Sequence, residues 1–90
     1  MELSIPTNLT LSLIVRDRAG IIFEGEVDAI SSYNESGPFD VLPLHTNFIS
    51  LIQKMLSIHR KEKVLQKVRV GSGVLFVHEN KVEVYLGILH

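Results

Sequence analysis

The side chains that could bind a metal ion are the four histidines of the chain, His45, His59, His78 and His90. Metal ligands that share a helix face stand four residues apart, and ligands within one turn stand closer together. No two of these histidines have either spacing, and the chain contains no cysteine to assist them. The sequence therefore predicts no metal centre.

Other patterns of catalytic chemistry are incomplete. The tripeptide Gly71-Ser72-Gly73 is not followed by the residues of a phosphate-binding loop or a nucleophile elbow, so we interpret it as a glycine-rich bend between strands. Glu24 and Glu26 stand two residues apart, and Glu79 and Glu83 lie near one turn. On a small sandwich such carboxylates form a solvated rim rather than a cleft that shifts pKa values. We expect no active site, no cofactor and no nucleotide binding.

Composition limits the remaining classes of protein. Ninety residues make a single domain, residues 1–90, with one core. A net charge of −1 provides no basic field for a nucleic acid, and the absence of cysteine fits a reducing compartment. No apolar run approaches the roughly 20 residues that span a bilayer, and no leader-like segment begins the chain. We expect a cytoplasmic protein that reaches a membrane only through another subunit.

Alternation with a period of two dominates the chain and predicts β-strands. In residues 9–16 the apolar positions alternate with mostly polar ones, and aliphatic and polar residues are interleaved again in residues 27–33. Residues 21–24 are predicted to form a short strand between them. Residues 34–38 are turn formers, and a short strand over 39–43 should end at Pro43, which has no amide hydrogen to donate. Residues 75–78 and 82–86 form a hairpin around Asn80. The prediction is an all-β antiparallel sandwich or flattened barrel of about eight to ten short strands.

One segment permits two interpretations. Its apolar residues recur at intervals of three and four, which is typical of a helix: Phe48, Leu51, Ile52, Met55 and Leu56. Strands would instead let a small sheet pair all its edges. We favour the strands.

A stretch around Pro43 departs from the alternation and carries the strongest motif. Six residues are in register with the signature of a known family: Gly37, Phe39, Val41, Leu42, Pro43 and His45. On these residues the chain resembles the ε subunit of F-type ATP synthases, a β-sandwich in the rotor stalk. The resemblance continues through residues 20–27 and 70–77, and so covers nearly the whole chain. It also implies that the segment with the helical spacing forms two short strands joined by a turn near Gln53 and Lys54.

The resemblance implies a non-catalytic rotor subunit that joins the γ subunit to the c ring of a proton- or sodium-driven synthase. Such a subunit lies on the inner face of the cell membrane, held there by the complex. The family loop places a carboxylate against basic groups in the polar loops of the c ring. Here Pro38 occupies the acidic position, and Asp40 lies about 7 Å further along the same strand face. Phe39 and Val41 should point into the core.

The resemblance also assigns roles to three further residues. Leu44 occupies a position where the family has glycine, within the stretch that meets the ring and γ. His45 matches the family histidine at the boundary between the ring and γ, although it could also only tie the loop to backbone carbonyls. Leu56 lies in the stretch that relatives place against γ, and a core role fits it equally well.

Two questions stay open at this level. A stand-alone β-sandwich that binds a small ligand or a peptide by strand addition is the alternative function. Longer members of the resembled family continue into a helical hairpin, whereas this sequence ends at His90. We therefore expect the short form without the hairpin, and the sequence does not distinguish a natural short form from part of a longer protein.

Overall fold

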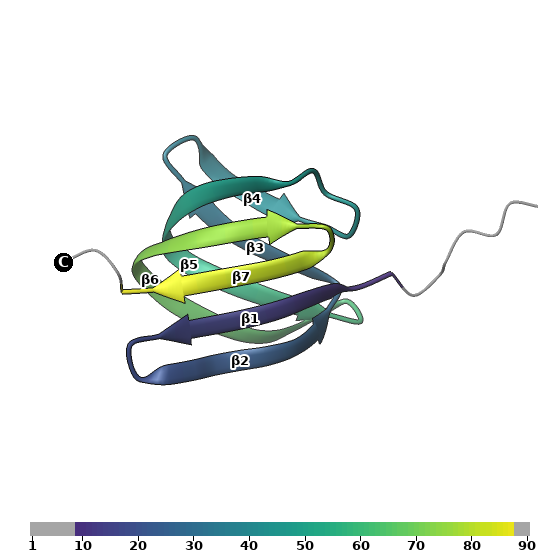
Figure 1. Ribbon diagram of the computed structural model, residues 1–90, viewed down its shortest axis with the longest axis horizontal. Helices are drawn as coiled ribbons and strands as arrows, with labels where there is room; N and C mark the ends of the chain where they lie inside the picture. Colours follow the sequence, from purple (N-terminus) through teal and green to yellow (C-terminus); the bar gives the residue numbers. More distant parts are fainter. Residues whose placement is uncertain (1–8, 88–90) are drawn as a thin grey trace, which may run out of the picture.

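The alternating residues near the start of the chain form a strand with one buried face. Leu11, Leu13 and Val15 are each at most 1% exposed, as the period of two predicts. The computed structural model describes residues 9–87, and in that range it contains strands and no helix (Figure 1). The strands are β1 (Leu11–Asp17), β2 (Gly20–Val27), β3 (Ala29–Asn34), β4 (Gly37–Val41), β5 (Phe48–Arg60), β6 (Lys63–His78) and β7 (Lys81–Leu86).

The strands form one curled sheet in the order β2-β1-β7-β6-β5-β3-β4. All neighbours are antiparallel except β1 and β7, which run parallel. In Figure 1, β1, β2 and β7 lie in front of β3 and β5, so the sheet folds over itself as a sandwich. The all-β sandwich predicted from the sequence is therefore confirmed. Seven strands replace the expected eight to ten because the long β5 and β6 each run through both layers.

The passage from one layer to the other depends on a bulge in β5 and β6. Their register shifts between Ile52 and Lys54, and Lys54 has a positive φ of 72°. The expected turn between two short strands is thus a bulge within one continuous strand. Opposite it, a Cβ on Gly73 would lie 2.9 Å from the Tyr85 carbonyl oxygen, so the tight approach of β7 requires glycine. The bend predicted at Gly71-Ser72-Gly73 lies inside β6 rather than between strands.

The turns use the local chemistry that the sequence predicts. The side-chain oxygen of Asn34 accepts a hydrogen bond from the Ser36 amide at 2.8 Å, in the turn between β3 and β4. Between β6 and β7, Glu79 and Asn80 both have positive φ, 48° and 64°, which is the pattern of a two-residue hairpin turn. Between β5 and β6, Lys61 and Glu62 show the same pattern, with φ of 52° and 63°. These tight turns fix the register of the antiparallel strands that they join.

Both layers contribute to one apolar core. Apolar side chains of all seven strands are buried in it. The buried set is Leu11, Leu13, Val15, Val27, Ile30, Val41, Ile52, Leu56, Ile58, Val70, Leu75, Val77, Val82, Val84 and Leu86. Phe39 and Phe48 pack against this core while remaining partly exposed, and both stand next to the loop that carries the sequence motif.

Candidate functional site

The β4–β5 loop, residues 42–47, is the segment on which the motif converges. β4 ends at Val41, and Pro43 lies just beyond it, where its missing amide hydrogen breaks no ladder bond. The His45 amide donates to the Leu42 carbonyl at 3.2 Å, which closes a turn around Leu44. Leu44 has a φ of 68° and is 72% exposed. The loop therefore presents a leucine to solvent from a left-handed backbone.

Two asparagines attach this loop to the turn between β6 and β7. The side-chain oxygen of Asn80 accepts a hydrogen bond from the Leu44 amide at 2.6 Å. The side-chain oxygen of Asn47 accepts one from the Glu79 amide at 3.0 Å. Each asparagine thus bonds the backbone of the other segment, and the two bonds hold the β4–β5 loop at both its middle and its end.

An aromatic row connects the loop to the core. The rings of His45 and Phe48 have centroids 4.8 Å apart, and those of Phe48 and Phe39 are 5.9 Å apart in an edge-to-face arrangement. Nδ1 of His45 donates to the Thr46 carbonyl at 2.7 Å. His45 thus makes a hydrogen bond to a backbone carbonyl, which is one of the two roles expected for it. Its ring is only half-buried, so part of it stays accessible to another protein.

Pro38 and Asp40 share the outer face of β4, an edge strand. Both are exposed, whereas Val41 is fully buried and Phe39 packs on the core, as the alternation predicts. Asp40 pairs across the ladder with Ser31. The carboxylate and Leu44 therefore occupy two separate surfaces of the same region, one on a strand face and one on a loop.

Leu56 does not belong to the surface. It is 0% exposed in the centre of the core, so of its two possible roles the structure supports the core role. A contact of this side chain with another subunit would require the sandwich to open. The helical spacing of its segment includes Leu51, which is 58% exposed, whereas Ile52 and Leu56 lie on the same face of the strand and are buried.

Beside the loop lies a shallow apolar groove that the sequence did not predict. It measures about 460 Å³ and lies between the first residues of β5 and the end of β6. Its lining residues are Asn47, Phe48, Ile49, Phe76, Val77 and His78. Ile49 and Phe76 are ladder partners with exposed side chains, so the groove extends the apolar surface. In the sequence, the only sign of this groove is that both strands carry apolar residues at outward-facing positions. The ladder register is needed to show that these residues lie side by side.

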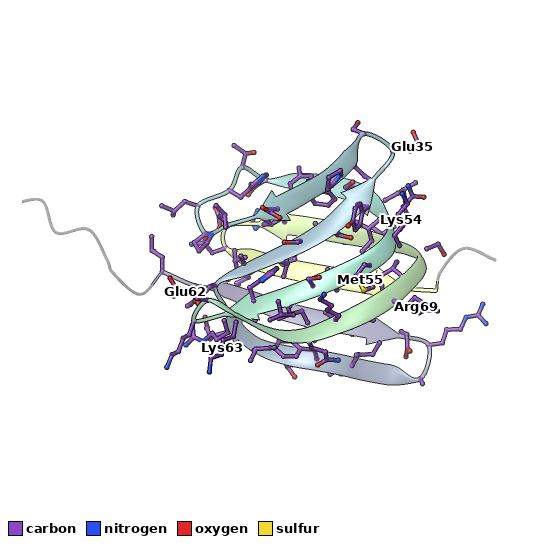
Figure 2. All side chains as sticks on the ribbon, turned by 180° about the vertical axis from the view of Figure 1, so that it is seen from behind. Glu35, Lys54, Met55, Glu62, Lys63 and Arg69 are labelled. Carbon is purple, nitrogen blue, oxygen red and sulfur yellow. The ribbon has the colours of Figure 1, made fainter. Side chains whose placement is uncertain are left out.

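Charged side chains gather on other parts of the sandwich. Figure 2 shows Lys54 and Arg69 on the outer side of β5 and β6, and Glu35 at the turn between β3 and β4. The ammonium group of Lys54 lies 5.5 Å from the centroid of the Tyr33 ring, a cation–π distance.

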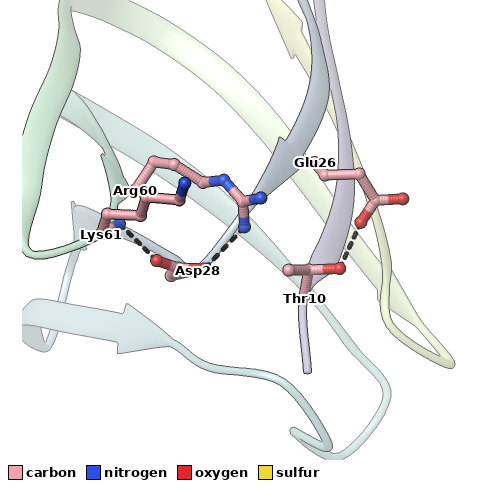
Figure 3. Close-up of polar contacts among 5 residues, drawn as sticks. All are labelled: Thr10, Glu26, Asp28, Arg60 and Lys61. Atoms are coloured by element: carbon pink, nitrogen blue, oxygen red, sulfur yellow. Dashed lines mark hydrogen bonds and ion pairs between the residues drawn. The ribbon is translucent and has the colours of Figure 1, made fainter. Parts of the chain in front are cut away.

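Asp28 makes the best-defined ion pair of the described residues. Its carboxylate accepts hydrogen bonds from the Lys61 amide and from Nη1 of Arg60, the latter at 2.9 Å, as Figure 3 shows. The hydrogen bond from the backbone amide of Lys61 is the main reason that the pKa of Asp28 is lowered, and the Arg60 guanidinium lowers this pKa further. Figure 3 also shows the hydroxyl of Thr10 donating to Glu26. The contacts of Asp28 with Arg60 and Lys61 join the bend between β2 and β3 to the turn between β5 and β6.

A group of side chains that could hold a metal ion is not found in residues 9–87. No three His, Asp or Glu side chains there come together as a metal site requires, and His90 lies outside the described residues. In the same range no helix has the length and apolarity to cross a membrane. The described surface carries an edge strand with a carboxylate, a loop held by two asparagine hydrogen bonds, and an apolar groove.

The sequence of residues 10–87 matches the family model described as the ATP synthase, Delta/Epsilon chain, beta-sandwich domain. This chain belongs to that family. The ATP synthase epsilon chain of Sulfurimonas denitrificans is 32% identical over 73 residues, which are 80% of this chain and 56% of the relative. The epsilon chain of a Nitratiruptor species is 30% identical over 73 residues, which are 80% of this chain and 57% of the relative. The resemblance to ε subunits is confirmed, and the chain spans little more than half the length of these relatives.

Solved structures show the same fold. A chain in the mitochondrial ATP synthase of Euglena gracilis, from an assembly with OSCP, F1 and c-ring, superposes with a TM-score of 0.79 at 18% identity. That match covers 96% of this chain and 57% of the other. A chain in the central stalk and c-ring of the Tetrahymena thermophila enzyme gives 0.73 at 12% identity, covering 84% and 62%. At these identities the likeness establishes the sandwich fold.

Proposed function

We propose that this chain is a non-catalytic subunit of the central stalk of an ion-driven F-type ATP synthase, and that it joins γ to the c ring. The observation that carries the proposal is the match of residues 10–87 to the ATP synthase delta/epsilon sandwich family. A connecting subunit needs shape and a complementary surface, not an active site. The clamped β4–β5 loop and the exposed outer face of β4 supply surfaces of that kind.

The proposal divides the contacts between two places. Asp40, with Pro38 beside it, provides the charged contact with the c ring from the outer face of β4. Leu44 and His45 lie at the junction between the ring and γ. The chain works at the cytoplasmic side of the membrane without entering it, because the complex holds it there. Either protons or sodium ions drive the ring, and this surface does not select between them.

Co-expression with γ and the c ring tests the proposal directly. A tagged chain should recover both partners, and vesicles that contain the synthase should lose ion-driven ATP synthesis when this subunit is omitted. Adding the purified chain back should restore synthesis. A chain that stays monomeric in the presence of γ and the ring would contradict the proposal and would favour a separate peptide-binding module.

A further inference from the structure

The apolar groove between the start of β5 and the end of β6 has aromatic lining residues that neighbouring rings hold in place. The Phe76 ring contacts the Tyr85 ring edge-to-face, with centroids 5.7 Å apart. Phe48, on the facing strand, is in contact with the rings of Phe39 and His45. A groove with lining residues that are already fixed needs little reorganisation to accept an apolar side chain.

The groove exposes apolar side chains to water, and its size limits what can cover them. Ile49 is 69% exposed and its ladder partner Phe76 is 37% exposed. Six residues line the groove, whose volume is about 460 Å³. A stable complex between two folded proteins takes roughly 20–30 residues on each side. A short segment therefore fits this groove better than a separate folded protein.

The start of β1 lies at the same end of the sandwich as the groove. Ser12 pairs with Lys81, and Lys81 pairs with His78, which lines the groove, so only β7 separates β1 from β6 here. Figure 1 shows β1 beginning beside the β6–β7 turn, whereas β7 ends at the opposite end of the sandwich. A segment that precedes β1 therefore starts next to the groove, and a segment that follows β7 does not.

Residues 1–8 precede β1 and lie outside both the described residues and the family match, which begins at residue 10. In their sequence the apolar Met1, Leu3 and Ile5 alternate with polar residues, so an extended chain would carry them on one face. Pro6 favours an extended conformation of the residue before it. Eight extended residues reach about 26 Å. Two strand spacings, as between β1 and β6, amount to only about 10 Å.

We propose that the segment before β1 folds back across β7 and places Leu3 and Ile5 in the apolar groove. Because the segment is tethered next to the groove, it meets it at an effective concentration of about 1 mM, and a weak intrinsic affinity is enough to hold it. Docking removes Ile49 and Phe76 from water. The inference does not depend on the proposed function, since the segment belongs to the chain itself.

Nuclear magnetic resonance of the full chain tests the docking directly. We expect nuclear Overhauser contacts between the methyl groups of Leu3 or Ile5 and the ring protons of Phe76 or Phe48. The double variant Leu3→Ser/Ile5→Ser should lose these contacts and shift the amide signals of residues 47–49 and 76–78. Ser4→Ala is its control, because it changes a polar position of the same segment and should leave those signals unchanged.

A second pair of variants approaches the groove from the other side. Ile49→Ser should remove the contacts with Leu3 and Ile5. Leu51→Ser is the matched control, because Leu51 is also an exposed apolar residue of β5 but does not line the groove. Thermal melting checks that each variant is folded, and the contacts in the parent chain decide the question even if a variant is not.

Four results would overturn the proposal. Absence of the contacts in the parent excludes docking, and so do groove signals that stay unchanged in Leu3→Ser/Ile5→Ser. Contacts that persist in Ile49→Ser place the segment elsewhere on the domain. Contacts that weaken on dilution show that a second copy of the chain supplies the segment. Contacts that are independent of concentration and lost in both Leu3→Ser/Ile5→Ser and Ile49→Ser support the docking.

Discussion

The amide of Leu44 and the side-chain oxygen of Asn80 are 2.6 Å apart, although 36 residues separate them in the chain. Asn80 adopts positive φ in the two-residue turn between β6 and β7, and this conformation directs its side chain to the β4–β5 loop. One residue thus shapes a hairpin and positions a loop. The most exposed large apolar side chain among the described residues thus depends on a turn elsewhere in the sheet.

Replacing Asn80 by glycine should loosen the loop while preserving the turn. Glycine adopts the required positive φ, so the loss is mainly the hydrogen bond to Leu44, worth about 0.5–1.5 kcal/mol. Hydrogen exchange of the Leu44 amide should become faster by the factor to which this loss of free energy corresponds. Glu79→Gly is the control, because it also relieves a positive φ and leaves the Asn80 bond in place. Unchanged exchange at Leu44 in Asn80→Gly would show that the bond does not hold the loop.

Gly73→Ala should destabilise the domain by about 1–3 kcal/mol, through crowding at the layer crossing. The added Cβ would lie 2.9 Å from the Tyr85 carbonyl oxygen, which the β6–β7 ladder holds in place, and 3.2 Å from Ile52. For a domain of this size each kcal/mol lowers the melting temperature by about 4–8 °C. Gly71→Ala is the matched control, since a Cβ there meets nothing within 4 Å. Equal melting temperatures for the two variants would refute the crowding argument.

Stability should depend on pH through Asp28. The Lys61 amide and the Arg60 guanidinium lower its folded-state pKa below the unfolded value of about 3.9. Its stabilising contribution is therefore complete above the unfolded pKa and is lost as pH falls through the folded pKa. Asp28→Asn should melt below the parent at neutral pH, and the difference should shrink on acidification. Thermal melts from about pH 7 to about pH 2 measure it. A difference that stays constant with pH would exclude the charge of Asp28 as its origin.

Asp40→Asn tests the charged contact without disturbing the fold. Asp40 is exposed on an edge strand, so the melting temperature should stay near that of the parent. Under the proposed function, assembly with the c ring should weaken by about 1–3 kcal/mol, because one charge leaves a partly desolvated contact. Glu35→Gln, at the neighbouring β3–β4 turn, should leave assembly unchanged (Figure 2). If Asp40→Asn assembles and supports ATP synthesis like the parent, its carboxylate has no role in coupling.

The sequence alone determined the elements whose causes are local. Alternation of apolar residues placed Leu11, Leu13 and Val15 inward, because successive side chains of a strand point to opposite faces. Asn80 marked the hairpin, since its side chain tolerates positive φ. The motif around Pro43 and His45 led to the correct family because its residue types at a fixed spacing need no tertiary information.

Only the tertiary structure decided what depends on residues distant in the chain. Leu56 shares the buried face of β5 with Ile52 and Ile58, and the pairing of β5 with β3 and β6 decides this, because the local spacing fits a helix as well. The loop conformation at Leu44 depends on Asn80, whose contribution no short window of sequence contains. Hydrogen bonds and packing between such distant residues form only when the strands are already arranged. No single segment of the sequence therefore determines them.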